Sequence, residues 1–350
     1  MTGTSSELGK LLDARHVERV RRAGALVLDV DDTLLARERA GGAGEESFTE
    51  SAPAALLPEL LRRGFNVCLI TGHGWQQLHS RLIAPIIGRL RESGDDAAAC
   101  IGRLRVYANR GATKIIRDGE RQGTDAVYGE RYQLRDEDKT ALRSLLETLG
   151  GEFDASYKAR REWFAATFPR FDFATLPARV SEREGAVLVL RPIPARMHAA
   201  QGEASNPRAE VYARGLELLR AANLSDRYEL AESGRSSIEI TRRGVSKEAA
   251  LRDLIAELTA TTEAATAATS EEAARVEESL VYVGDEFFAG GNDFVIPRVF
   301  PRALCLSVAA ESAGEETPAG VVSLVRATGA RGTAATEALL AHVLNLSARV

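Results

Sequence analysis

Cysteine is scarce in this sequence: only Cys68, Cys100 and Cys305 occur among its 350 residues. An odd number of cysteines does not suit a disulfide framework, and two of them lie in apolar runs typical of core strands. We therefore expect a reducing, cytoplasmic setting. Long apolar runs are also missing, and the N-terminal residues lack the apolar middle segment of a signal peptide. We expect no membrane partner.

A strong excess of charge of one sign is missing as well. The net charge of −5 gives no reason to expect a nucleic acid as a partner of the whole molecule. What the sequence does have is 45% hydrophobic and 27% charged residues, the balance of a soluble globular protein. At 350 residues, without internal repeats, the chain is expected to form two domains.

The rest of the chain can be arranged around residues 25–34, ALVLDVDDTL. The first four form an apolar run typical of a buried strand, and Asp29, Asp31 and Asp32 follow it. Ligands of open α/β sheets bind at the carboxyl ends of the strands, so these acids are expected to meet there. Crowded carboxylates are costly to bury unless a cation joins them, which favours magnesium with a phosphate ester. Taken alone, the pattern also fits acids that cap the next helix.

Other strand ends supply polar groups that suit phosphate and metal. The apolar run 66–70 leads to Thr71, whose hydroxyl and following glycines suit a phosphoryl oxygen, although an ordinary helix cap looks the same. Lys247 begins a predicted helix, where the helix dipole disfavours a cation unless an anion is near. The run 280–283 leads to Asp285 and Asp293, whose spacing does not match a calcium-binding EF-hand.

The middle of the chain differs in character. Predicted strands at 186–191 and 237–241 mix with predicted helices at 136–149 and 208–222, which describes a separate α+β domain inserted into the first. We therefore expect a discontinuous catalytic core of residues 1–122 and 241–350, and an inserted cap domain of residues 123–240.

In chain order, Asp29 with Asp31, then Thr71, Lys247 and the acidic loop ending at Asp293 resemble the four motifs of the haloacid dehalogenase superfamily of phosphohydrolases. The resemblance spans roughly residues 24–345, and four motifs in order are far more specific than any one of them. It implies an α/β fold with a Rossmann-like, doubly wound parallel-sheet core and an inserted α+β cap that sets substrate specificity. It also implies Mg²⁺ as the cofactor.

The chemistry expected of these residues is phosphoryl transfer, which needs an in-line nucleophile, neutralised oxygens and a protonated leaving group. Asp29 is the candidate nucleophile and would form an aspartyl-phosphate. Asp31, on the same face of an extended chain, is the candidate general acid and base. Thr71 and Lys247 would hold phosphoryl oxygens.

The candidate metal site consists of carboxylate and carbonyl oxygens, the ligands that Mg²⁺ prefers. Its expected members are Asp29, Asp31 through its backbone carbonyl, Asp285 and Asp293. Asp293 and Asn292 would orient ligands or metal-bound water.

A closer resemblance is to the branch of Cof-type phosphatases and eukaryotic-type phosphomannomutase, whose last motif ends in Gly-Gly-Asn-Asp, as at residues 290–293 here. The resemblance implies a set of substrate-binding residues: Arg183, Arg196, Arg208, Ser237, Glu239 and Asn292. The arginines would bind a second anionic group of the substrate. This sequence departs from the branch at Leu188, where the mutases have an asparagine. It departs again at Thr71-Gly72, which is closer to the phosphatase form.

The leading hypothesis is a Mg²⁺-dependent phosphatase of a small phosphorylated sugar or polyol, acting as a monomer or homodimer. A phosphohexomutase is the alternative, favoured by the arginines but not by Thr71-Gly72. A noncatalytic phosphosugar or nucleic-acid binding module is a third hypothesis, because residues 158–170 interleave bases with aromatic side chains. Such a stretch is more often an amphipathic helix. His73 is interpreted as a polar loop residue, since no second histidine or cysteine is spaced for a transition metal.

Overall fold

The computed structural model describes residues 14–36, 46–93, 96–118, 121–159, 179–191, 208–233, 237–262, 270–289, 291–309 and 317–347. The chain forms two compact units: Met1–Asp125 with Ser246–Val350, and Ala126–Val245 inserted between these segments. The junctions expected after residues 122 and 240 differ from these because β5 (Arg121–Thr124) and β9 (Ser237–Arg242) continue past them. No described helix is both long enough and apolar enough to cross a bilayer.

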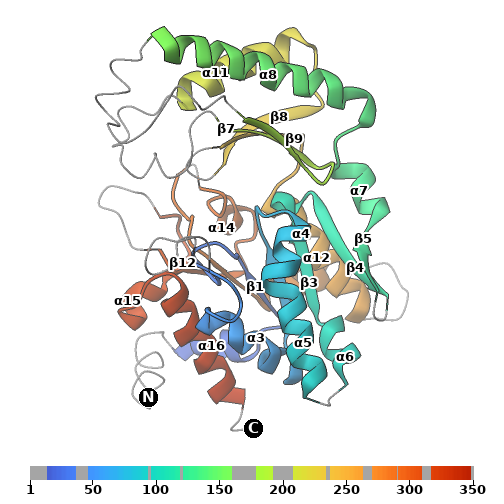
Figure 1. The fold of residues 1–350 in the computed structure, drawn as a ribbon. Helices are drawn as coiled ribbons and strands as arrows, with labels where there is room; N and C mark the ends of the chain where they lie inside the picture. Colours follow the sequence, from blue (N-terminus) through green and yellow to red (C-terminus); the bar gives the residue numbers. More distant parts are fainter. Residues whose placement is uncertain are drawn as a thin grey trace. The chain divides into compact units, whose positions relative to one another are not determined.

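The first unit is built on a sheet of eight described strands (Figure 1). Across the sheet they are β12 (Val321–Ser323), β11 (Leu304–Ser307), β10 (Leu280–Gly284), β1 (Ala25–Leu28), β2 (Asn66–Ile70), β3 (Leu104–Ala108), β4 (Thr113–Asp118) and β5. The strands from β12 to β3 run parallel, whereas β4 and β5 join the edge as an antiparallel hairpin. The predicted α/β fold with a parallel core sheet is therefore confirmed.

The register of the central strands brings their carboxyl ends to one edge. Leu28 of β1 lies opposite Leu69 of β2 and Val283 of β10. The ladder extends one residue beyond β1, where the Asp29 N–H donates to the Val283 carbonyl at 3.0 Å. Polar residues that follow these buried strands therefore emerge side by side.

Helices cover both faces of this sheet. In chain order they are α2 (Ala14–Arg21), α3 (Ala52–Arg62), α4 (Trp75–Leu78), α5 (Ala84–Glu92), α6 (Ala97–Gly102), α12 (Lys247–Thr262), α13 (Ser270–Glu278), α14 (Ile296–Val299), α15 (Leu324–Thr328) and α16 (Thr333–Ser347). On one face, an apolar cluster joins strand residues such as Leu28 and Val106 to Leu57 of α3 and Leu340 of α16. Tyr107 points to the opposite face, where its hydroxyl donates to Asp253 of α12 at 2.7 Å.

A π-helical turn, His79–Ile83, lies between α4 and α5. Pro85 lacks an N–H and cannot donate to the Arg81 carbonyl one turn earlier. That carbonyl instead accepts from the Phe48 N–H at 3.0 Å. The interruption therefore connects this helix to the segment before α3.

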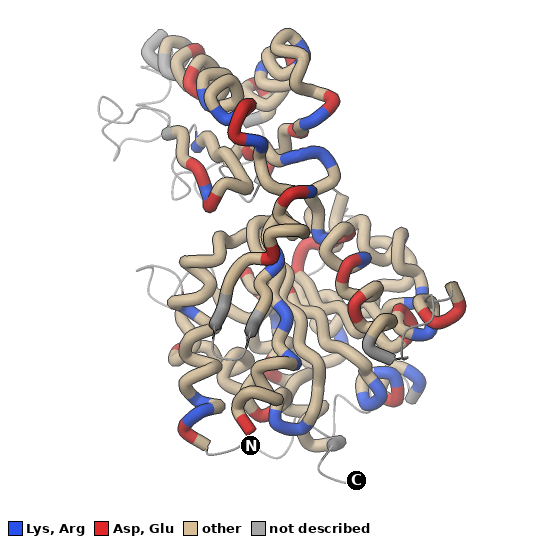
Figure 2. The backbone as a smooth tube through the Cα atoms, turned by 90° about the vertical axis from the view of Figure 1, so that its right-hand side faces the viewer, with Lys and Arg blue, Asp and Glu red and all other residues tan. Residues whose placement is uncertain are grey.

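The inserted unit has an antiparallel sheet of four described strands, ordered β6 (Arg179–Arg183), β7 (Val187–Arg191), β9 and β8 (Tyr228–Ser233). Its described helices are α7 (Ala126–Tyr132), α8 (Asp136–Ala159) and α11 (Arg208–Ala221). Leu188 and Ile240 pack with Leu146 of α8, so the two long helices cover one face of the sheet. Strand alternation places Arg183 and Glu239 on the other face. Figure 2 shows Lys and Arg interspersed with Asp and Glu along the described backbone.

Candidate active site

Asp29 is the residue at the centre of the first unit's strand edge. It directly follows β1, and only 3% of its surface is exposed. A carboxylate this deeply buried requires compensating charge. Lys247 supplies it, because its Nζ lies 3.1 Å from Asp29 Oδ2.

Lys247 is held between two carboxylates. Its Nζ also lies 2.8 Å from Asp293 Oδ1, and all three side chains are almost completely buried. Burial alone would lower the pKa of Lys247, but Asp29 and Asp293 outweigh it and raise the pKa above the usual range. The ammonium group is therefore stable at the start of α12 despite the unfavourable helix dipole.

Asp293 is fixed by three donors. Its Oδ1 accepts from Lys247 and from the Tyr282 hydroxyl, the latter at 2.5 Å, and its Oδ2 accepts from the Glu286 N–H at 3.0 Å. A Cβ at Gly284 would lie 2.3 Å from Asp293 Oδ2, so the carboxylate packs directly against this glycine. These contacts make Asp293 a rigid part of the site.

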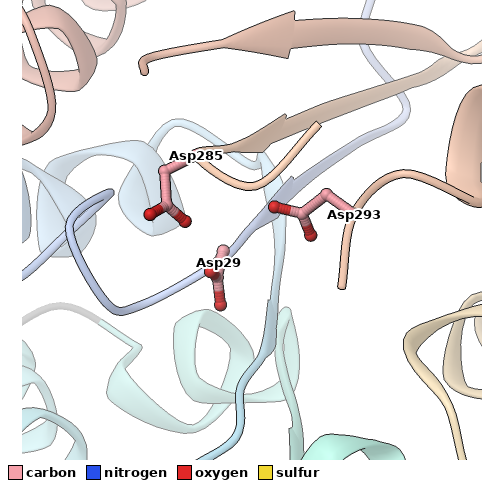
Figure 3. Close-up of side chains that lie close together, drawn as sticks. All are labelled: Asp29, Asp285 and Asp293. Atoms are coloured by element: carbon pink, nitrogen blue, oxygen red, sulfur yellow. The ribbon is translucent and has the colours of Figure 1, made fainter. Parts of the chain in front are cut away.

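Three carboxylates converge where a divalent cation could bind (Figure 3). Asp29, Asp285 and Asp293 each offer one oxygen within 4.8 Å of the others, the only such metal-compatible group among the described residues. Burial raises the pKa of Asp29 to about 7 in spite of Lys247, and Asp293 and Asp31 add to the increase. A cation at this point would relieve that repulsion. The buried Asn292 Oδ1 accepts no hydrogen bond from the described residues, so it is a further oxygen suited to a bound ion or its water.

Asp31 lies outside this carboxylate group. Its Oδ1 is 2.6 Å from His73 Nε2, and its side chain is 23% exposed. The structure thus gives Asp31 a different environment from Asp29. Two acids two residues apart, one buried against a lysine and the other partly exposed against a histidine, are suited to different roles.

Thr71 is fully buried at the end of β2. Its Oγ1 accepts from the His73 N–H at 3.1 Å, and its carbonyl accepts from the Arg110 N–H at 2.7 Å. These contacts hold the turn that carries the hydroxyl. The hydroxyl group accepts one hydrogen bond here and is chemically able to donate another.

No protein-family model matches the chain, and no curated protein matches it. Among solved structures, N-terminal truncated IMP-nucleotidase of Plasmodium falciparum matches with a TM-score of 0.53 and 13% identity, over 96% of this chain and 74% of that chain. The C-terminal truncated form of that protein matches with a TM-score of 0.50 and 13% identity, over 95% of this chain and 76% of that one. The chain has the haloacid dehalogenase fold. At these identities the similarity shows the fold alone.

Trehalose-6-phosphate phosphatase of Aspergillus fumigatus also matches, with 12% identity over 95% of this chain and 97% of that chain. Its TM-score of 0.49 is too low to support an inference. That the chain belongs to the phosphomannomutase-like branch stays a prediction.

The inserted unit holds the residues predicted to bind substrate, except Asn292, which lies in the first unit. Arg183 forms an ion pair with Glu239, which is 2% exposed, and Ser237 lies two residues before Glu239 on β9. Arg196 lies outside the described residues, as does the side chain of Arg208 at the start of α11. The basic and aromatic stretch 158–170 also lies outside them, apart from the backbone of the last two residues of α8.

Sequence reasoning missed Tyr282 and the contact of His73 at the site in the first unit, and Arg191 in the inserted unit. Tyr282 lies inside an apolar run, and nothing in the sequence indicated that its hydroxyl donates a hydrogen bond to Asp293. Arg191 lies on the polar face of the inserted unit's sheet. The alternation of side chains along β7 was the only feature of the sequence that indicated this position. His73 was interpreted as a polar loop residue, although its position two residues after Thr71 at a strand end could have indicated a site.

Proposed function

We propose that this protein is a Mg²⁺-dependent phosphatase that hydrolyses a small phosphorylated sugar or polyol through an aspartyl-phosphate. One observation carries the proposal: three separate segments bring Asp29, Lys247 and the pair Asp285 and Asp293 together in the first unit. A noncatalytic binding module has no use for such crowded, buried carboxylates, which reduce stability unless they serve chemistry.

The proposed reaction has two steps. Asp29 attacks phosphorus and forms an O–P bond, while the bond to the ester oxygen breaks and Asp31 gives its proton to that oxygen. Water then attacks the phosphorus and gives its proton to Asp31, which releases phosphate and restores Asp29. Thr71 and Lys247 bind phosphoryl oxygens, and the ammonium group also neutralises Asp29 and Asp293.

The residues present fit Mg²⁺. Asp29, Asp285 and the backbone carbonyl of Asp31 would hold the ion, and Asp293 and Asn292 would orient its ligands or water. Asp293 already accepts from three donors, so its part is to position the others more than to bind directly. When bound, Mg²⁺ neutralises the charge that develops on the transferred phosphoryl group.

The experiment that tests this function is a panel of sugar and polyol phosphates, assayed for phosphate release with Mg²⁺ and with a chelator. Phosphate release that requires Mg²⁺ and falls at least about 10³-fold in D29N supports the proposal. D32N is the matched control, because Asn tolerates the left-handed conformation of Asp32 at φ 52°. Release that persists in D29N refutes the covalent mechanism.

A phosphohexomutase is the second candidate, and the polar face of the inserted unit's sheet favours it. Arg183 and Arg191 both lie near Glu239, and burial together with Arg183 lowers the pKa of Arg191. Two guanidinium groups around one carboxylate suit a second anionic group of a substrate. Interconversion of hexose 1- and 6-phosphates with a bisphosphate activator, without net phosphate release, would establish the mutase.

The role of this face is tested with R183A. The variant should raise KM for a substrate with a distal anion and leave the hydrolysis of p-nitrophenyl phosphate unchanged. R214A is the matched control, because Arg214 pairs with Glu152 on the helical side of the same unit. Equal losses on both substrates would mean that the assignment of the inserted unit as a specificity cap is wrong.

A further inference from the structure

His73 is a side chain that the proposed reaction does not use, although it touches one of the two reacting acids. Its Nε2 lies 2.6 Å from Asp31 Oδ1. The two side chains are 12% and 23% exposed, so the contact lies partly out of water. The contact is therefore a close hydrogen bond between a ring nitrogen and a carboxyl oxygen.

The backbone of His73 is clamped on both sides. Its N–H donates to Thr71 Oγ1 at 3.1 Å, and its carbonyl accepts from the Asn109 N–H at 2.7 Å. Asn109 and Arg110 both adopt left-handed conformations, with φ of 54° and 62°. Asn adopts this conformation more readily than most residues, but Arg110 is strained there, and such strain persists where the surrounding structure requires it. Here the strained turn holds the segment that carries the imidazole.

Asp31 is less constrained by its own backbone. It lies on the loop after β1, where it forms an isolated β-bridge with Leu35. A hydrogen bond to one oxygen restricts the rotation of a carboxyl group about its side-chain bonds. Binding of Oδ1 by a fixed imidazole sets the orientation of the whole carboxyl group, including Oδ2.

We infer that His73 is a positioning residue that aims the Asp31 carboxyl group at the leaving oxygen of the ester. The inference rests on the proposed function, in which Asp31 protonates that oxygen as its bond to phosphorus breaks. His73 itself neither bonds to phosphorus nor loses a proton in the step. Its effect is to keep the donor aligned, and misalignment of a proton donor slows only reactions that need the proton.

The loss of rate should therefore depend on how much the leaving group needs a proton. This dependence distinguishes a positioning role of His73 from a purely structural one. In a series of substituted phenyl phosphates, the shape of the substrate stays nearly constant while the leaving group changes from activated to unactivated. p-Nitrophenolate leaves without protonation, whereas unsubstituted phenolate gains much more from an acid. A structural defect would lower kcat/KM by one factor across the whole series.

The experiment measures kcat/KM for this series with wild type, H73A and H73Q. H73A should lose about 10–100-fold on unsubstituted phenyl phosphate and less than about threefold on p-nitrophenyl phosphate. H73Q places an amide nitrogen near the position of Nε2 and should recover part of the loss. H79A is the matched control, because His79 packs against the Trp75 ring in the preceding helical turn and should leave the series unchanged.

Equal losses on all leaving groups, or no loss in H73A, would overturn the inference. If H73A does not fold, H73N serves instead, since its amide keeps the turn polar but is too short to reach Asp31. Failure of the proposed function looks different: wild type would then hydrolyse none of the series, or D29N would be as active as wild type.

Discussion

Lys247 is the residue on which the charge balance of the site depends. The residue is 3% exposed, and its ammonium group lies 3.1 Å from Asp29 and 2.8 Å from Asp293. Removing one partner of a buried ion pair leaves an uncompensated charge, which costs far more than the pair itself contributes. The lysine therefore stabilises the fold, in addition to its proposed part in binding the phosphoryl group.

Substitution of this lysine tests that balance. K247M should lower the free energy of unfolding by about 3–5 kcal/mol in the presence of a chelator, and it should abolish phosphate release. Urea unfolding followed by circular dichroism measures the change. K139M is the matched control, since Lys139 is 28% exposed and pairs with exposed Asp136, and it should cost about 1 kcal/mol or less. Equal stability of K247M and wild type would contradict the assigned charge balance.

Single residues also show how far sequence reasoning reaches. Asp29, Thr71 and Asp285 could be placed together because each follows a buried parallel strand, and such strands end at one edge. The convergence of Lys247 on them came from the family resemblance, since nothing local in the sequence indicates its partners. The contact of His73 with Asp31 depends on the path of the turn after Thr71, which is held by the distant Asn109, and no periodicity in the sequence indicates that path.

Among the elements, the described part of the loop from β10 to α14 packs closely at the site. A Cβ at Gly291 would lie 2.2 Å from the Glu286 carbonyl oxygen. The Glu286 N–H in turn donates to Asp293, so the loop backbone and the acidic side chain are coupled.

G291A should force the backbone near Glu286 to move. Overpacking of this kind costs about 1–3 kcal/mol, and we expect kcat to fall at least about tenfold as Asp293 shifts. Urea unfolding and phosphate release measure the two effects. G88A in α5 is the matched control, because a Cβ there meets nothing within 4 Å and should be neutral or stabilising. Unchanged activity in G291A would show that the loop tolerates the movement.

Helix α12 carries Lys247 at its start and is tied to the sheet further along. Glu257 accepts from Arg105 Nε at 2.7 Å and lies 3.1 Å from Lys114 Nζ. Burial alone would raise the pKa of Glu257, but the hydrogen bonds from Arg105 and Lys114 outweigh it and lower the pKa below 4.5. An acid whose pKa is lower in the folded state stabilises the fold above its unfolded pKa, and the effect disappears as the pH falls through the folded pKa.

E257Q should therefore be less stable than wild type by about 1–2 kcal/mol at pH 7. The difference should shrink as the pH falls below about 4.5. Thermal unfolding across this pH range measures it. A difference that stays constant with pH would show that Glu257 acts through packing and not through its charge.

The limits of prediction are clear at the scale of elements. The central strands were predictable because they are fully buried on both faces, and the confirmed α/β fold follows from them. Strand β12 was missed because its three residues are partly exposed at the edge of the sheet. The π-helical turn before Pro85 was missed because its stability depends on Phe48, which lies far away in the sequence.

For the whole molecule, the binding of Mg²⁺ should appear as added stability, because a ligand that binds only the folded state shifts the equilibrium toward it. At a concentration about 100 times Kd the gain is about 2.7 kcal/mol. Thermal unfolding with increasing Mg²⁺ measures it. The gain should be lost in D285N and kept in D32N, and an equal shift in both variants would place the ion elsewhere.

The most direct measurement of the central claim is to trap the covalent intermediate. Wild type turning over a sugar phosphate with Mg²⁺ is treated with borohydride, which reduces an aspartyl-phosphate to homoserine, and its peptides are analysed by mass spectrometry. We expect the reduced side chain at Asp29, only in the presence of substrate, and nothing at Asp31 or Asp32. Full turnover with no modification at Asp29, or modification of another acid in its place, would contradict the account.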